Sequence, residues 1–135
     1  MNLDFFNRKP PKSLDRNDFS FLSDLVSNLS DEDGAATLTA ICIETICLSL
    51  THLPNKPSKW LICGGGRNNR TIIKGLQKRL DAPVLTVEEI GLDGDMLEAQ
   101  AFGYLAARVV KNLPLSSPTT TGCKSPTIGG RISHP

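Results

Sequence analysis

Residues 60–70 read W-L-I-C-G-G-G-R-N-N-R: a short apolar run, three consecutive glycines and a polar segment. The apolar run lies between proline and glycine, a pattern typical of a buried strand in a parallel sheet. Glycines lose more backbone freedom on folding than other residues, so three in a row call for an explanation. The sequence leaves three explanations open: a ligand that approaches the backbone, a tight turn, or a packed helix.

The segments around this stretch alternate between helix and strand patterns. A helical period covers residues 68–81, and the apolar V-L-T-V follows in a second strand at residues 83–88. Strand, turn, helix and strand make a β-α-β unit, so the two strands are expected to be parallel, with a right-handed crossover. Further helices are expected at residues 17–29, 31–52 and 95–113, the second with Ser30 as its N-cap. The fold class is therefore α/β, with few parallel strands packed with three to four helices.

Two strands are too few for a self-sufficient parallel sheet that is covered by helices on both faces. Either strands elsewhere in the chain have been missed, or the chain is part of a larger sheet. We favour the larger sheet and expect exposed apolar surface where the remainder docks. The expected organisation is a leading segment at residues 1–16, an α/β lobe at residues 17–113, and an irregular tail rich in Pro, Ser, Thr and Gly at residues 114–135.

Composition excludes several classes of protein. The formal net charge of +1 gives no electrostatic footprint for nucleic acid or an anionic membrane. Polar residues interrupt the longest apolar segment, residues 35–53, so no membrane helix of ~18 residues is expected. The 4 cysteines form no C-x-x-C pair, which favours a reducing cytoplasm over a disulfide scaffold and argues against a zinc site.

The first candidate site is the glycine turn, which we define as Gly64, Gly65 and Gly66. Ligands of open α/β sheets bind beyond the carboxyl ends of the strands, where helix N-termini offer free N–H groups. Asn69 adds a polar side chain at the same place. A dinucleotide fingerprint, G-x-G-x-x-G, would need a third glycine where Asn69 stands, although Glu88 and Glu89 lie near the position of a ribose-binding acid. A turn that only lets strand and helix pack is the other interpretation.

The second candidate site lies in G-L-D-G-D-M-L-E-A-Q-A-F-G-Y-L-A, residues 91–106. Asp93 and Asp95 precede the expected helix, and Glu98 lies in its first turn. Caps and partners of the helix dipole are the common role of such carboxylates. The alternative is that Glu98, one turn before Phe102, is partly buried and directed at the same strand-end cleft as the glycines. A carboxylate there would accept hydrogen bonds from sugar hydroxyls.

Five motifs, in this order, carry a family resemblance that covers essentially the whole chain. They are P-P-K-S near the start, L-S-D-E-D-G-A-A-T-L-T-A (29–40), L-I-C-G-G-G-R-N-N (61–69), residues 91–106 as quoted above, and P-T-T-T-G-C (118–123). The chain resembles the C-terminal part of the anhydro-N-acetylmuramic acid kinases. The resemblance implies the C-terminal lobe of an actin/hexokinase-like (ribonuclease H-like) kinase. Gly103 departs from the family pattern, where alanine is typical.

The resemblance also implies a reaction and ligands. Family members use ATP with Mg²⁺ to open the 1,6-anhydro bond and phosphorylate the sugar, giving N-acetylmuramic acid 6-phosphate in peptidoglycan recycling. The glycine turn and Asn69 match the adenosine side of the ATP cleft, and Glu98 matches a glutamate that contacts the anhydro-sugar. A homodimer is a further assembly to consider, whereas no nucleic-acid or membrane partner is expected.

The motifs of phosphoryl transfer itself are expected in another part of such a kinase. No G-T-S-x-D-G phosphate loop occurs in these 135 residues, and no segment matches the region of the catalytic aspartate or of Mg²⁺ ligands. We therefore expect no catalytic residue here and no turnover by this polypeptide alone. Two hypotheses follow: one lobe of a split kinase, or a non-catalytic remnant that binds nucleotide or a partner at most.

Overall fold

The computed structural model describes residues 4–133 and contains one small parallel sheet and five α-helices within that range. The strands are β1 (Trp60–Ile62) and β2 (Val84–Thr86), and the helices are α1 (Phe21–Val26), α2 (Asp31–Leu48), α3 (Arg70–Arg79), α4 (Leu97–Val110) and α5 (Pro118–Thr121). Short 3-10 helices lie at Asp4–Phe6, Arg16–Phe19, Ser49–His52, Gly65–Asn68 and Val87–Ile90. The mixed α/β class is confirmed, as is the parallel pairing of the strands, with Leu61 opposite Leu85.

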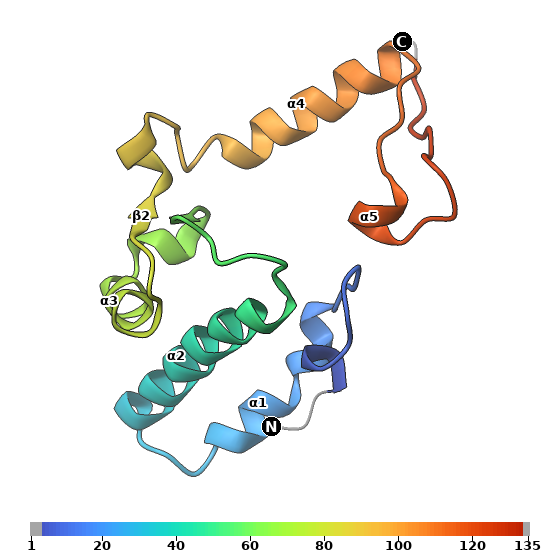
Figure 1. The fold of residues 1–135 in the computed structure, drawn as a ribbon. Coiled ribbons are helices and arrows are strands. Elements are labelled where there is room, and N and C mark those ends of the chain that lie inside the picture. The colour runs from blue at the N-terminus through green and yellow to red at the C-terminus, as the bar shows by residue number, and fades with distance from the viewer. Residues whose placement is uncertain (1–3, 134–135) are drawn as a thin grey trace.

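The hydrophobic core lies between α2, α3 and the two strands. Leu76 is fully buried, and Leu80 and Val84 pack with it to form the centre of the core. Ile43 and Ile46 of α2 cover this centre from one side. Glu44 and Arg79 also join α2 to α3 through a two-pronged ion pair, in which Arg79 Nη2 lies 2.7 Å from Glu44 Oε2. Figure 1 shows α2 and α3 lying together below the sheet.

Much apolar surface is left uncovered, as the two-stranded sheet led us to expect. On α4, Phe102, Tyr104 and Val110 are 63%, 61% and 72% exposed, and no residue of that helix is buried. Leu61, in the middle of β1, is 40% exposed. Figure 1 shows α4 extending away from α2 and α3, with the C-terminal segment returning beside it. The described residues thus form a small packed unit joined to a helix with little cover.

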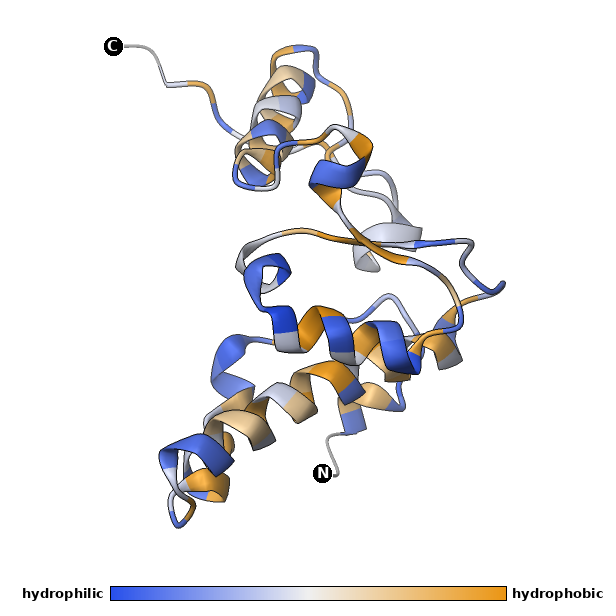
Figure 2. Cartoon of the chain, turned by 90° about the vertical axis from the view of Figure 1, so that its left-hand side faces the viewer, coloured by the Kyte–Doolittle hydropathy of each residue, from blue (hydrophilic) through white to orange (hydrophobic). Residues whose placement is uncertain are grey.

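The helix α2 is apolar around most of its circumference, and Figure 2 shows this along its length. Ser30 caps it as predicted, because the Ser30 hydroxyl accepts a hydrogen bond of 3.1 Å from the N–H of Asp33. By length and composition, Asp31–His52 could also cross a membrane, with 11% of its most apolar window buried in this chain. The sequence expectation that polar interruptions rule out such a segment was therefore too strict. A helix that packs against its own protein on more than one side has the same apolar composition as a membrane-spanning helix, and α2 packs against both α1 and α3.

Side chains that bond to the backbone explain most of the differences in element bounds. The expected helix at 17–29 divides into a 3-10 turn and α1, because Asp15 and Asp18 form a capping box around the 3-10 turn. The second strand ends at Thr86 rather than residue 88, because Thr86 and Glu89 form another capping box that starts a 3-10 turn. Within residues 114–133 the structure contains α5 and an isolated antiparallel bridge from Ser116 to Thr127, joined by irregular backbone.

Candidate functional site

The three glycines of the turn differ in what explains them. The backbone angles at Gly64 require glycine, whereas neither backbone angles nor packing among the described residues require it at Gly65 and Gly66. Gly64 has φ 69° and ψ −176°, a region that is essentially restricted to glycine. Gly65 and Gly66 begin the 3-10 turn Gly65–Asn68, and a Cβ added at either would meet no atom within 4 Å. Packing against a neighbouring helix therefore does not explain these two glycines within the described chain.

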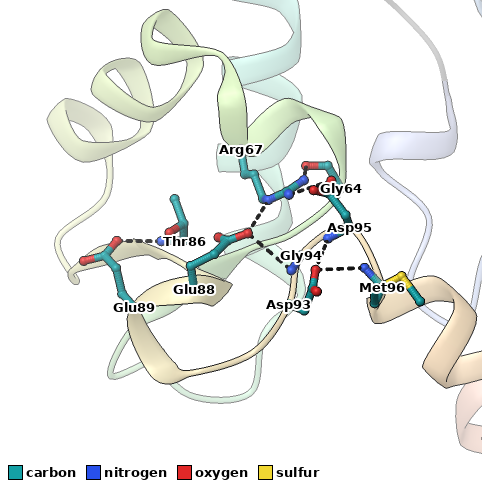
Figure 3. A network of polar contacts seen from close by, with 9 residues as sticks. All are labelled: Gly64, Arg67, Thr86, Glu88, Glu89, Asp93, Gly94, Asp95 and Met96. Atoms are coloured by element: carbon teal, nitrogen blue, oxygen red, sulfur yellow. Dashed lines mark hydrogen bonds and ion pairs between the residues drawn. The ribbon is translucent and has the colours of Figure 1, made fainter.

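Arg67 connects three segments at the carboxyl ends of the strands, as Figure 3 shows. Its Nε donates to Glu88 Oε1 at 2.6 Å, and its Nη1 donates to the Gly64 carbonyl at 3.0 Å. Its Nη2 lies 2.7 Å from Asp95 Oδ1. The Arg67 side chain is only 7% exposed, so the guanidinium is a buried charge that is neutralised by two carboxylates. We call this group, with Gly64, Glu88 and Asp95, the Arg67 clamp.

The clamp shifts the pKa values of its own members. The hydrogen bond to Asp95 raises the pKa of Arg67 most, and the hydrogen bond to Glu88 raises it further. The hydrogen bond from Arg67, helped by a backbone N–H, lowers the pKa of Glu88. Each shift favours the charged form, because the opposite charge and the donated hydrogen bond stabilise it. The clamp is therefore an ion pair near neutral pH.

Gly94 lies against the clamp and has no room for a side chain. Its backbone N–H donates to Glu88 Oε1 at 3.2 Å. A Cβ at this position would collide with Arg67 Nε and Cζ and with the Glu88 carboxylate. Asp93, next to it, accepts from the N–H groups of Asp95 and Met96 at 3.0 and 3.2 Å. This turn delays the start of α4 to Leu97, two residues later than predicted.

A hollow of about 470 Å³ opens beside the clamp. It is lined by Cys63, Gly64, Gly65, Arg67, Gly94, Asp95, Leu97, Glu98 and Ala101. Two of the three predicted glycines thus share one hollow with Glu98, although the two motifs are separated by the whole of α3 and β2. Glu98 is exposed, which corrects the expectation that its carboxylate is partly buried.

Gly66 and Asn69 do not line this hollow. Asn69 is the N-cap of α3: its Oδ1 accepts from the N–H groups of Thr71 and Ile72 at 3.0 and 3.2 Å. The sequence predicted α3 to start at residue 68, one residue before this cap. The side-chain oxygen of Asn69 is therefore engaged in the fold, while its amide N–H₂ is left for other partners.

Both acidic residues of the dinucleotide alternative are engaged in the fold, and Glu89 accepts from the N–H of Thr86 at 2.7 Å. In that reading Glu88 would bind a ribose hydroxyl, but its carboxylate is bound to Arg67 and to the Gly94 N–H. Sequence reasoning missed both Arg67 and Gly94. The available signal was an arginine directly after the glycine turn, together with carboxylates after the second strand and before α4.

Residues 4–133 contain no group of three His, Cys, Asp or Glu side chains placed to hold a metal ion. All four cysteines are free thiols. A further hollow of about 380 Å³ lies at the opposite ends of the strands, around Trp60, Leu53 and Pro57. Its rim carries the exposed ion pair of Lys56 and Asp81, at 3.6 Å. It is not adjacent to either predicted motif.

Comparison with known proteins places this α/β chain in a class of carbohydrate kinases. The family model for anhydro-N-acetylmuramic acid kinase matches residues 1–135, so the chain belongs to the anhydro-N-acetylmuramic acid kinase family. A relative of that name from Roseobacter denitrificans is 53% identical over 131 residues, which is 97% of this chain and 35% of the relative. One from Zymomonas mobilis is 51% identical over 134 residues, 99% of this chain and 36% of the relative.

A relative from Bradyrhizobium diazoefficiens, with the same name, is 46% identical over 136 aligned positions, covering 100% of this chain and 36% of the relative. The chain thus spans about a third of the length of the curated relatives that it matches. The family resemblance drawn from the motifs is confirmed.

Proposed function

We propose that residues 1–135 form the C-terminal nucleotide- and sugar-binding lobe of an anhydro-N-acetylmuramic acid kinase. The kinase would open the 1,6-anhydro bond at the expense of ATP and give N-acetylmuramic acid 6-phosphate for peptidoglycan recycling. The observation that carries the proposal is that Gly64 and Gly65 of the glycine turn line one hollow together with Glu98. In the proposal this lobe has an actin/hexokinase-like fold and works in the cytoplasm, and a homodimer is one candidate assembly.

The glycine turn is proposed to receive the adenosine part of ATP. Gly65 and Gly66 have open space where a side chain would stand, so a flat ligand can approach the backbone there. The charges around the hollow support adenosine rather than phosphate. Glu88, Asp95 and Glu98 carry three negative charges against the single positive charge of Arg67, which disfavours a nearby triphosphate.

Glu98 is proposed to accept hydrogen bonds from the sugar hydroxyls. Its exposed carboxylate lines the hollow and makes no ion pair with another described residue. An ionised carboxylate accepts hydrogen bonds only, and hydroxyls are the donors that a sugar offers. The family resemblance assigns no Mg²⁺ ligand to these residues. Magnesium enters the proposal only as the partner of ATP in the family.

A binding experiment tests the nucleotide half of the proposal. Calorimetry of this chain should give an affinity for adenosine at least equal to that for ATP without Mg²⁺, because the triphosphate meets the acidic rim. Gly65→Val should abolish binding of both, and Gly103→Val, at an equally open position outside the hollow, should leave it intact. Equal binding by Gly65→Val and the unchanged chain would show that the triplet is only a turn.

The kinase half is tested with a second polypeptide. The G-T-S-x-D-G loop that the family uses for phosphate is absent from these 135 residues, so this polypeptide alone is proposed to have no turnover. Mixing it with a lobe that carries this loop should restore ATP-dependent conversion of anhydro-N-acetylmuramic acid. A folded complex without turnover would favour the remnant hypothesis.

A further inference from the structure

We propose that Arg67 is a positioning residue, which holds the wall of the hollow that carries Glu98 against the wall formed by the glycine turn. The inference rests on the proposed function for the identity of the ligands, whereas the geometry of the clamp is independent of them. Arg67 itself is proposed to act through its neighbours in the clamp, because each of its three guanidinium nitrogens bonds within the chain and its side chain is only 7% exposed.

The first step of the argument is the weak attachment of α4. No residue of this helix is buried, and it makes no extensive contact with another helix or strand in residues 4–133. Most of what packs on it is its own C-terminal continuation: Arg108 donates to the Pro114 carbonyl at 2.6 Å, and Gly130 lies against Val109. Apolar packing therefore does little to fix the direction of α4.

The second step is the connection between α4 and the sheet. Residues 91–96 join β2 and its 3-10 turn to α4, and their backbone is tied to that turn by Gly94 N–H and by Leu92 N–H, which donates to Val87 O at 3.1 Å. The last tie before α4 is the ion pair of Asp95 with Arg67. Asp95 is three residues before Glu98, so its position determines where Glu98 enters the hollow.

The third step is that Arg67 belongs to the opposite wall. It lies within the 3-10 turn Gly65–Asn68, and it bonds to the carbonyl of Gly64, where the backbone has its glycine-only conformation. The one guanidinium thus bonds to the start of the glycine turn and to the residue that leads into α4. Its planar set of donors can serve three acceptors at fixed angles, which a lysine cannot do.

The test disrupts only one of the three contacts of Arg67, the ion pair with Asp95 that joins the glycine turn to α4. Asp95→Asn removes the charge from the link to α4 and Asp95→Ala removes the acceptor as well, and both leave Arg67 bound to Glu88 and Gly64; because the Asp95 side chain is 80% exposed, both variants should fold. Asp81→Asn is the matched control, since it makes the same chemical change in an exposed ion pair away from the hollow. Residual dipolar couplings of the backbone amides, without ligand, report the orientation of α4 relative to α3.

In Asp95→Asn the couplings of α4 should no longer fit the alignment tensor of α3, whereas in Asp81→Asn they should. Asp95→Glu, which keeps a carboxylate, should restore part of the fixed orientation. With ligands added, Asp95→Asn should keep its affinity for adenosine and lose about tenfold or more for anhydro-N-acetylmuramic acid, as expected for a lost charge-assisted hydrogen bond.

The outcomes distinguish this inference from the proposed function. An unchanged orientation of α4 in both Asp95→Asn and Asp95→Ala would overturn the positioning role, whatever the ligands do. A changed orientation, with no ligand bound by the unchanged chain, would support the clamp and count against the proposed function. Loss of adenosine and sugar affinity by the same factor in Asp95→Asn would also overturn the positioning role, because it would show a general structural effect.

Discussion

The backbone N–H of Gly94 donates to the same Glu88 oxygen that accepts from Arg67, at 3.2 Å. The glycine therefore lies directly on a partly buried ion pair, and its missing side chain is required by space rather than by backbone angles. Gly94→Ala should lower the stability by about 1–3 kcal/mol, the usual cost of overpacking. Urea unfolding measures this. Gly65→Ala, whose Cβ meets no neighbour, is the control and should unfold close to the unchanged chain.

Acid should weaken the chain partly through Glu88. Because its pKa is lowered in the folded chain, Glu88 contributes stability above the ordinary glutamate pKa of about 4.3, and this is lost as the pH falls through the lower folded value. Denaturation followed from about pH 6 to pH 3 should therefore show a falling stability. Glu88→Gln should be less stable at neutral pH and show a shallower fall. An unchanged slope would show that Glu88 has the same pKa in both states.

Asn69 has a role in the fold that can be separated from its proposed role in binding. Asn69→Ala removes the cap of α3 and should cost about 0.5–2 kcal/mol of stability. Asn69→Asp keeps the oxygen that accepts from Thr71 and Ile72, but lacks the amide donor. If Asn69 contacts the nucleotide, Asn69→Asp should keep its melting temperature and lose adenosine affinity. Full adenosine affinity in Asn69→Asp would show that Asn69 acts only as the N-cap of α3.

The core should be sensitive to a single truncation. Leu76 is fully buried among residues of α2, α3 and the sheet, so Leu76→Ala should cost about 2–5 kcal/mol. With a core of so few residues, that cost should leave the chain largely unfolded at room temperature by circular dichroism. Leu25→Ala, at a leucine that is 55% exposed, is the control and should stay within about 0.5 kcal/mol. Similar losses in both variants would contradict the assigned core.

Gly103 offers a stabilising change in the interior of α4. It has helical neighbours on both sides, and an added Cβ meets nothing within 4 Å. Gly103→Ala should favour the helix by about 1 kcal/mol, because alanine loses less backbone freedom. Amide hydrogen exchange within α4 should slow accordingly. The contrast is Gly75 of α3, where a Cβ would meet Ile43 and offset the gain.

Much of the central unit could be predicted from the sequence because local signals agree there. Proline and glycine bound β1, a helical period marks α3, and a connection that contains a whole helix favours a parallel crossover between the strands. The ends of the elements were harder to predict. Thr86 with Glu89, and Asp93 with Met96, replace regular backbone bonding by side-chain bonding, which residue periodicity does not report.

The candidate site was predictable in position but not in construction. One of the two interpretations of Glu98 directs it at the same strand-end cleft as the glycine turn, and Glu98 does share a hollow with Gly64 and Gly65. The burial of Arg67 depends on Glu88, 21 residues further on, and on the turn around Gly94. Spacing alone does not predict such a tertiary arrangement. Because Glu88 is bonded to Arg67, its carboxylate is also engaged in the fold, which counts against the dinucleotide site.

The backbone angles at Gly64 have a consequence for how this protein tolerates change. In a saturation library selected only for folded protein, codon 64 should be depleted of every residue but glycine, since its backbone region excludes other side chains. Codons 65 and 66 should accept small residues under the same selection, because there is space for them. Only a second selection, for ligand, should remove those survivors. Three identical letters in the sequence would then record two separate evolutionary pressures.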